Sequence, residues 1–154
     1  MRTLADLMAS HAGAGRVAWI GLRPARRAAM VAVERAEVDE AGLRGDRHPA
    51  PGKRAVTLIQ AEHLPVIAAL ARRAEVAPEA LRRNVVVAGI NLAAFKGRDL
   101  AVGGAVLRIA GPCAPCSRME ETLGPGGYSA VRHHGGWCAA VVSGGAVALG
   151  DAVR

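Results

Sequence analysis

The sequence predicts a mainly β fold of the α+β class, a β-barrel or barrel-like domain with a few short helices. Short apolar runs of strand length recur at close spacing along the chain. Nineteen glycines and eight prolines punctuate its 154 residues, which favours many turns over long helices. Strands and helices do not alternate regularly, so a repeating βαβ architecture is not expected. A chain of this length most simply forms one domain.

The first third of the chain predicts one short helix, two strands and a long loop. Residues 3–10 place apolar side chains on one helical face, and residues 1–14 are interpreted as a helical extension. Residues 16–22 predict a strand, and residues 30–38 predict a single half-exposed strand. Residues 42–54 form a polar loop rich in glycine and proline, and loops of this length are often functional.

The middle of the chain predicts a strand, two helices and a second strand. Residues 55–59 are apolar throughout except for one threonine, as in a buried strand. Residues 61–73 carry apolar side chains at helical spacing, with Pro65 in the first turn. Pro78 begins a second short helix, and residues 85–87 return to a strand.

The C-terminal part of the chain predicts short strands joined at glycines. Gly103-Gly104 separates two apolar runs, 100–102 and 105–109, and is a hairpin signal. Residues 143–145, Ser-Gly-Gly, separate a second pair of strands at 139–142 and 146–149.

The charge balance predicts an anionic partner. Twenty basic residues face thirteen acidic ones, for a net charge of +7, and all basic residues but Lys53 and Lys96 are arginine. Arginine recognises phosphate and carboxylate groups in a bidentate manner. A solubilising charge excess is the alternative. Nucleic acid is not expected as a partner, because the chain has no aromatic stacking platform and no basic helix.

The hydropathy pattern predicts a cytoplasmic protein with no membrane partner. No run of 18 or more apolar residues occurs, and the N-terminus lacks the apolar core of a signal peptide. Three cysteines in a reducing compartment argue against a structural disulfide framework.

Cys113 and Cys116 are the most informative residues for function. Ser117 and Glu120 match a capping box, which predicts Ser117 as the N-cap of a short helix and places Cys116 just before it. The helix dipole and Arg118 both favour the thiolate form, which ligates metals and attacks electrophiles.

Three other interpretations of these thiols remain open. Both cysteines can be small buried hydrophobic residues. A thioredoxin-like dithiol fits the local pattern of strand, Cys-x-x-Cys and helix, but lacks the βαβ framework. A zinc site can be drawn from Cys113, Cys116, Cys138 and either His133 or His134.

Two further stretches suggest anion binding. Arg82-Arg83-Asn84 follows a short helix and precedes a strand. Residues 132–136, Arg-His-His-Gly-Gly, form a polar loop whose glycines let backbone N–H groups approach an anion. Each stretch alone can be a solvated loop, but their combination with an activated thiol predicts an anion-binding pocket.

Six motifs give the chain a family resemblance. They are Gly-Asp-Arg-His at 45–48, Lys-Arg-Ala-Val-Thr-Leu-Ile at 53–59, the segment 81–92 beginning Leu-Arg-Arg-Asn, Gly-Arg-Asp-Leu-Ala-Val-Gly at 97–103, Gly-Pro-Cys-Ala-Pro-Cys-Ser-Arg-Met-Glu at 111–120, and His-Gly-Gly at 134–136. Over residues 15–154 the sequence resembles a stand-alone MOSC domain, the domain found at the C-terminus of molybdenum cofactor sulfurases.

The resemblance implies a closed barrel of the pyruvate-kinase-barrel type, a molybdopterin-type molybdenum cofactor and a cysteine that ligates molybdenum or carries sulfur as a persulfide. The family's Pro-Cys-x-Arg pattern matches residues 115–118 and assigns that role, catalytic and metal-binding, to Cys116. Cys113 is the weaker candidate. The expected cofactor-binding set is Arg82, Arg83, Asn84, Ser117, Arg118, Arg132, His133, His134, Gly135, Gly136, Arg54 and His48.

The leading functional hypothesis is a molybdenum-cofactor protein that reduces N-hydroxylated compounds or transfers sulfur, working with a redox partner or a sulfur-donor protein. The alternatives are a non-enzymatic cofactor carrier and a zinc-stabilised binding module. Pyridoxal phosphate is not expected, because Lys53 and Lys96, both in loop-like settings, offer no convincing Schiff-base residue.

Overall fold

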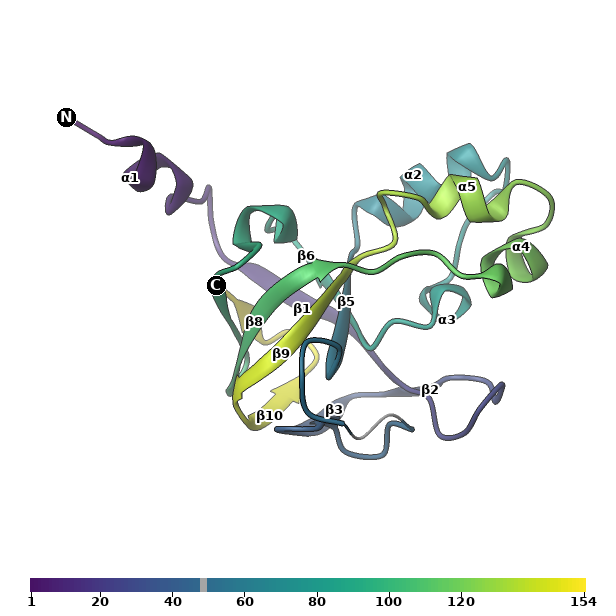
Figure 1. The fold of residues 1–154 in the computed structure, drawn as a ribbon, viewed down its shortest axis with the longest axis horizontal. Coiled ribbons are helices and arrows are strands. Elements are labelled where there is room, and N and C mark those ends of the chain that lie inside the picture. The colour runs from purple at the N-terminus through teal and green to yellow at the C-terminus, as the bar shows by residue number, and fades with distance from the viewer. Residues whose placement is uncertain (48–49) are drawn as a thin grey trace.

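Seven strands close into a barrel at the centre of the molecule (Figure 1). In a computed structural model that describes residues 1–47 and 50–154, their order is β1, β6, β5, β9, β8, β7 and β11, and β11 pairs back onto β1. The bounds are β1 Gly15–Leu22, β5 Val56–Gln60, β6 Val85–Ala88, β7 Asp99–Val102, β8 Ala105–Pro112, β9 Trp137–Ser143 and β11 Ala152–Val153. The barrel class expected from the sequence is therefore confirmed.

One pair of neighbouring strands in the barrel is parallel. β5 and β6 pair in the same direction, with Leu58 opposite Val85, whereas the other barrel pairings are antiparallel. The two helices α2 (His63–Leu70) and α3 (Pro78–Leu81) lie in the crossover between them. The sequence showed no regular βαβ alternation, and the structure contains this one βαβ unit among the residues it describes.

A second, three-stranded sheet lies beside the barrel in the order β10, β3, β4. Its strands are β3 Arg35–Asp39, β4 Gly42–Leu43 and β10 Gly145–Ala148. The strands around residues 143–145 are present as predicted, but they do not pair with each other. β9 stays in the barrel and β10 pairs with β3. By contrast, β7 and β8 form the predicted hairpin, with Val102 opposite Ala105.

The single strand predicted over residues 30–38 is wrong. The segment divides at Glu34 into β2 (Val31–Val33), which pairs with β1, and β3 in the small sheet. The carbonyl of Glu34 accepts a hydrogen bond from the N–H of Leu149 (2.9 Å), so the bend between the two strands is held by the chain just after β10. Glu34 interrupts the apolar alternation, which passes from Val31 and Val33 to Ala36 and Val38, but the alternation does not show that the two halves pair with different strands.

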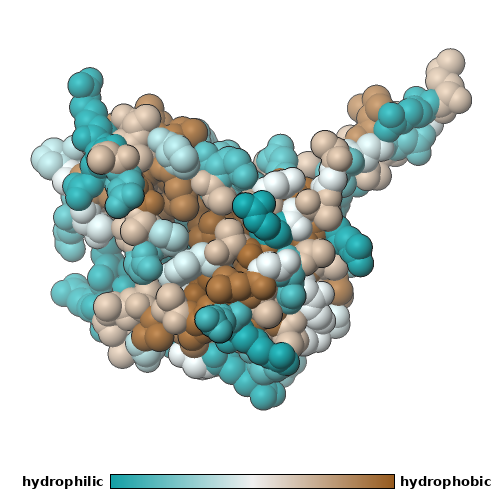
Figure 2. Space-filling model, turned by 180° about the vertical axis from the view of Figure 1, so that it is seen from behind, coloured by the Kyte–Doolittle hydropathy of each residue, from teal (hydrophilic) through white to brown (hydrophobic). Residues whose placement is uncertain are grey.

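Four helices cover one side of the barrel, and α1 (Leu4–Met8) stands apart from it (Figures 1 and 2). Besides α2 and α3, the covering helices are α4 (Ser117–Leu123) and α5 (Gly127–Val131), and η1 (Leu92–Phe95) is a short 3-10 turn. His11 stacks on Phe95 with ring centroids 4.5 Å apart and joins the base of the extension to η1. None of the helices among the described residues has the length and apolar character that crossing a bilayer requires.

Two apolar cores explain why β5 and β6 are buried on both faces. Leu58 and Val85 point into the barrel, whereas Ile59 and Val86 pack against the covering helices. Strands that are covered on both sides read as continuous apolar runs, which is the pattern in residues 55–59 and 85–87. The helix layer contributes Ile67, Ala68, Val76, Leu81, Met119, Leu123 and Val131 to the second core.

Asn84 fixes the barrel end at which β1 finishes and β6 begins. Its side-chain oxygen accepts hydrogen bonds from the N–H and hydroxyl of Thr57 (3.2 Å each), and its side-chain NH2 donates to the carbonyl of Gly21 (3.2 Å). Asn84 is fully buried, so these bonds satisfy a side chain that would otherwise be costly to bury. They hold β1, β5 and β6 in register where the site described below is built.

Replacing Gly136 with alanine is expected to lower the free energy of unfolding by about 3 kcal/mol. The backbone φ of Gly136 is +96°, and an added Cβ would collide with the carbonyl oxygen of Leu58. Gly97→Ala is the matched control: φ is +73°, but no atom lies within 4 Å of the added carbon. Its cost should be about 1 kcal/mol. Denaturant unfolding measures both values, and equal losses would contradict the packing role of Gly136.

Candidate functional site

The candidate site lies at the barrel end where strands from distant parts of the sequence meet. β1 ends at Leu22, directly before Arg23, and its antiparallel neighbour β6 begins just after Arg83. β8 runs out into the segment that contains Cys113 and Cys116, beside the start of β9. The fold therefore brings an arginine-rich stretch and a thiol-bearing stretch to one place.

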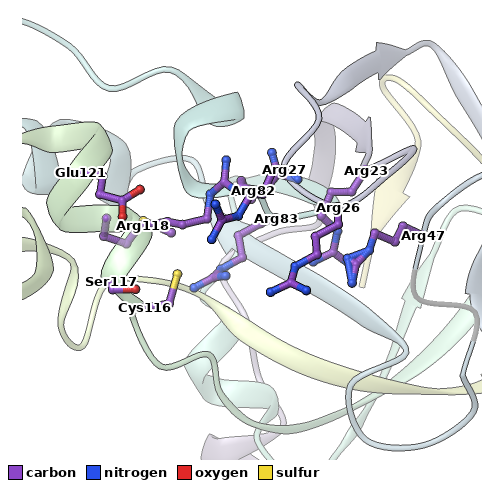
Figure 3. Close-up of a pocket in the computed structure, with 11 residues that line it drawn as sticks. Arg23, Arg26, Arg27, Arg47, Arg82, Arg83, Cys116, Ser117, Arg118 and Glu121 are labelled. Atoms are coloured by element: carbon purple, nitrogen blue, oxygen red, sulfur yellow. The ribbon is translucent and has the colours of Figure 1, made fainter.

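A cavity of about 520 Å³, here called the arginine cavity, is lined by seven arginines and Cys116 (Figure 3). Its lining residues are Arg23, Arg26, Arg27, Arg47, Arg82, Arg83, Cys116, Ser117, Arg118, Met119 and Glu121. Among the described residues, Arg23 is the only one of these arginines that forms an ion pair with a carboxylate. Such an excess of guanidinium groups in one concavity attracts anions.

Arg23 and Asp46 form a nearly buried ion pair that fixes the loop after β4. The guanidinium group of Arg23 donates through Nε and Nη2 to the two carboxylate oxygens (3.1 and 2.7 Å), and the Arg23 N–H donates to Oδ1 (2.8 Å). The carbonyl of Arg23 accepts a bond from the N–H of Arg47 (2.7 Å). This pair is why Arg47 reaches the cavity from a loop far along the chain.

The hydrogen bonds of Asp46 also set its protonation. Burial alone would raise the pKa of this carboxyl, but the side-chain and backbone hydrogen bonds from Arg23, together with the guanidinium charge, hold the pKa below its usual value. Asp46 is therefore ionised at neutral pH and compensates one of the seven cavity arginines.

Two cavity arginines occupy left-handed backbone conformations. Arg27 has φ +61° and Arg82 has φ +57°, and such conformations cost non-glycine residues about 1 kcal/mol or more. Arg82 caps the C-terminal end of α3 and donates to the carbonyl of Ala28 (2.7 Å), which joins the two arginine stretches. Burial and the neighbouring charges of Arg118, Arg23 and Arg47 lower the pKa of Arg82, a sign of like-charge crowding. Guanidinium groups remain protonated under such a shift.

Arg83 is the most buried of the cavity arginines. Its Nε donates to the carbonyl of Gly135 (2.7 Å) and its Nη2 to the carbonyl of Ala114 (3.4 Å). These two bonds connect the start of β6 to the loop before β9 and to the cysteine segment. Carbonyl groups satisfy the donors without neutralising the charge, so Arg83 adds a positive potential at the thiols.

Cys116 is exposed and is itself the N-cap residue of α4, with an extended backbone (φ −125°, ψ 170°). The predicted capping box is wrong. Ser117 is the first helical residue, and the Glu120 carboxylate accepts bonds from the N–H groups of Gly126 (2.9 Å) and Tyr128 (3.0 Å) at the start of α5. Cys116 makes no capping hydrogen bond through its sulfur, which points into the arginine cavity (Figure 3).

A second cavity of about 530 Å³, here called the thiol cavity, shares Arg23, Arg83 and Cys116 with the first. Its lining residues are Arg23, Ala50, Arg54, Thr57, Arg83, Pro112, Cys113, Ala114, Pro115, Cys116 and Cys138. All three cysteines of the chain therefore line one cavity, and the sulfurs of Cys113 and Cys138 lie 3.0 Å apart.

The structure brings together about half of the site residues expected from the sequence. Arg82, Arg83, Cys116, Ser117 and Arg118 line the arginine cavity, and Arg54 and Cys113 line the thiol cavity. His48 lies outside the described residues.

The remaining expected residues lie apart from both cavities or support them from behind. Arg132 and His133 are exposed and line neither cavity, and the ring of His134 packs edge-on against that of His63. Gly135 accepts the hydrogen bond from Arg83 through its carbonyl, and Gly136 packs on Leu58. Asn84 is buried and fully hydrogen-bonded within the barrel wall.

The zinc site drawn from the sequence does not form. Cys113 and Cys138 meet, but within residues 1–47 and 50–154 no group of three or more His, Cys, Asp or Glu side chains is placed to hold a metal ion. His133 and His134 line neither cavity.

Sequence reasoning missed Arg23, Arg26, Arg27 and Arg47 as site residues, and it considered Cys138 only as a zinc ligand. The cluster Arg23-Pro24-Ala25-Arg26-Arg27 directly after a strand was a usable signal, because clustered like charges attract anions. Nothing local identifies Cys138, whose place beside Cys113 depends on the register of β8 and β9.

Comparison with known proteins identifies the class. A family model described as the MOSC domain matches residues 23–154, nearly the whole chain, and the chain belongs to the MOSC domain family. No curated protein matches it in sequence.

Solved structures share the fold at low sequence identity. The YuaD protein from Bacillus subtilis superposes with a TM-score of 0.81 at 19% identity, covering 92% of this chain and 94% of that one. YiiM from Escherichia coli gives a TM-score of 0.69 at 20% identity, with 90% and 68% covered. YiiM from Geobacillus stearothermophilus gives 0.69 at 17% identity, with 90% and 73% covered. At these identities the likeness shows the fold alone.

Replacing Asp46 with asparagine should lower the free energy of unfolding at pH 7 by about 2–3 kcal/mol, since the buried guanidinium of Arg23 loses its ionic partner. Because the folded-state pKa of Asp46 is depressed, this stabilisation is present above the unfolded pKa of about 4 and is lost as the pH falls through the folded value. The difference between wild type and variant should therefore shrink in acid.

Denaturant unfolding at several pH values checks this expectation. Asp99→Asn, which breaks the exposed Arg108–Asp99 pair, is the control and should change stability little at any pH. A loss for Asp46→Asn that stays constant down to strongly acidic pH would contradict the assignment.

Proposed function

We propose that the arginine cavity binds an anionic, molybdopterin-type molybdenum cofactor and that Cys116 is its thiolate ligand. The single observation that carries this proposal is the exposed sulfur of Cys116 opening into a cavity lined by seven arginines. Membership of the MOSC family supports the same cofactor class.

The residues of the cavity fit such a group in charge and in ligand type. A phosphorylated pterin carries negative charge at neutral pH, and Arg26, Arg27, Arg82 and Arg118 offer guanidinium groups that form no ion pair with a carboxylate in the described part of the chain. A thiolate is a soft ligand suited to a redox metal. The volume of about 520 Å³ lies within the range of small-molecule sites.

Each part of the cavity then has a distinct task. The arginines after β1 and α3 bind and orient the phosphate end, while the start of α4 fixes the backbone of Cys116. Arg83 and Arg118 keep the neighbourhood of the sulfur positive. When bound, the cofactor would supply two-electron redox chemistry, with reduction of an N-hydroxylated compound as the proposed reaction and a redox protein as electron donor.

Sulfur transfer is the second candidate, favoured by one observation: all three cysteines face the thiol cavity. In this version Cys116 carries a persulfide received from a sulfur-donor protein, and the surrounding guanidinium groups stabilise its negative charge. A chain that binds the cofactor but neither reduces hydroxylamines nor carries sulfur would act as a non-enzymatic carrier.

Inorganic pyrophosphate is expected to bind the arginine cavity, and Arg82→Ala and Arg118→Ala should each weaken binding by roughly tenfold or more, because each removes a charge-assisted contact. Arg132→Ala removes the same charge from an exposed position outside the cavity and is the matched control. Calorimetric titration at fixed ionic strength measures the affinities. Equal weakening in all three variants would mean that binding follows net charge and not the cavity.

Protein produced with molybdate and purified rapidly is expected to contain molybdenum together with pterin fluorescence, and Cys116→Ser should lose most of the molybdenum because a hydroxyl is a poor soft-metal ligand. Elemental analysis and persulfide-specific labelling of the same preparations separate the candidates. Persulfide at Cys116 without molybdenum supports sulfur transfer. Zinc at one ion per chain, or molybdenum content unchanged by Cys116→Ser, would overturn the cofactor proposal.

A further inference from the structure

Cys113 and Cys138 form a thiol pair inside the thiol cavity that the cofactor proposal does not use. Their sulfurs lie 3.0 Å apart, and both thiols are free. The β8–β9 ladder sets this contact: Cys138 pairs with Gly111, and the N–H of Cys113 donates to the carbonyl of Gly136 (2.8 Å). Cys113 and Cys138 are thus diagonal neighbours across the ladder, within mutual reach on one face of it.

The surroundings of this pair suit an attacking thiol and a resolving thiol. Cys113 is buried at 8% exposure, whereas Cys138 is half-buried, and both line the cavity. The charged groups that act on the pair are Arg83, Arg23 and Arg54, and all three line the same cavity. Cations beside a partly exposed thiol favour its thiolate, the form that attacks sulfur.

We propose that Cys113 and Cys138 are a redox-active dithiol that undergoes thiol–disulfide exchange with small-molecule disulfides entering the thiol cavity. Cys138 is the attacking residue and Cys113 is the resolving residue. This activity is distinct from the role proposed for Cys116 and does not depend on a bound cofactor.

The exchange balances as a two-electron step. The Cys138 thiolate attacks one sulfur of the incoming disulfide R–S–S–R, whose S–S bond breaks to leave a mixed disulfide on Cys138 and one RS⁻. Cys113 then loses its proton to the released thiolate and attacks the Cys138 sulfur, expelling the second RS⁻, which takes a proton from water. Overall, the two cysteines are oxidised to a Cys113–Cys138 disulfide and R–S–S–R is reduced to two RSH.

The asymmetry between the two thiols follows from their contact. Either thiol can be the donor in this contact, and Cys138 is the more exposed of the two. A hydrogen bond from Cys113, with the charges of Arg83 and Arg54, lowers the pKa of Cys138 to about 6 despite its partial burial. The same hydrogen bond and burial raise the pKa of Cys113.

Formation of the disulfide needs the two sulfurs to approach by about a further 1 Å to reach disulfide length. The ladder is irregular between Ile109 and Gly111, two residues before Cys113.

Protein carrying Cys116→Ser isolates the pair, because the chain has only three cysteines. Incubation with oxidised glutathione, acid quenching and intact-mass analysis should show loss of two hydrogen atoms and no glutathione adduct, with Cys113 linked to Cys138 in the peptide map. Alkylation of the reduced protein should label Cys138 roughly tenfold faster than Cys113. Thermal unfolding confirms that each variant is folded.

Two further variants in the same background assign the roles. Cys113→Ala removes the resolving thiol and should trap a stable glutathione adduct on Cys138, whereas Cys138→Ala should leave Cys113 unmodified. A persistent adduct on Cys138 while Cys113 is present, two thiols that stay free in fully oxidised glutathione, or disulfides only between molecules would overturn the proposal. These readouts use Cys116→Ser protein without cofactor. They can therefore fail while cofactor binding is confirmed, and cofactor binding can fail while they succeed.

Discussion

A buried guanidinium, that of Arg83, is the interaction on which the rest of the site depends. Its hydrogen bonds to the carbonyls of Gly135 and Ala114 join the start of β6 to the loop before β9 and to the cysteine segment. Carbonyl acceptors satisfy the donors but leave the charge uncancelled, and a buried charge is costly unless something compensates it. Arg83 borders both cavities, so an anion or a thiolate in either one can provide that compensation.

The distribution of carboxylates around the cavities explains why they differ from an ordinary basic surface. Asp46 neutralises Arg23 and uses this pair to anchor the loop that carries Arg47. The other cavity arginines have no such partner in the described part of the chain, and two of them sit on left-handed backbone. Seven cavity arginines gathered around few carboxylates reduce stability unless a ligand binds them, and conformational strain of the kind seen at Arg27 and Arg82 concentrates at functional sites. The proposed thiol chemistry and the proposed anion binding therefore depend on one electrostatic arrangement.

Local signals in the sequence predicted the individual strands better than their partners. Glycine turns and apolar runs were enough to place β1, β5, β6 and the β7–β8 hairpin. The split of residues 30–38 and the pairing of β10 with β3 depend on contacts between distant segments, which periodicity does not encode.

The same limit applies to the site. Cys116, Arg82, Arg83 and Arg118 stand in recognisable motifs. Arg47 stands in one too, but its place in the cavity depends on the ion pair of Asp46 with Arg23, and Cys138 meets Cys113 only through the β8–β9 register. Asn84, Gly135 and Gly136 lie in the motifs too, but they hold the barrel end together.

The central claim is that the Cys116 sulfur and the unneutralised arginines face one shared space. The most direct test is the rate at which iodoacetamide alkylates Cys116, followed by peptide mass analysis with and without saturating pyrophosphate at constant ionic strength. A shared cavity predicts that the bound anion slows alkylation of Cys116 several-fold and that Arg82→Ala abolishes this protection. An alkylation rate for Cys116 that is unchanged at saturating pyrophosphate would contradict the account.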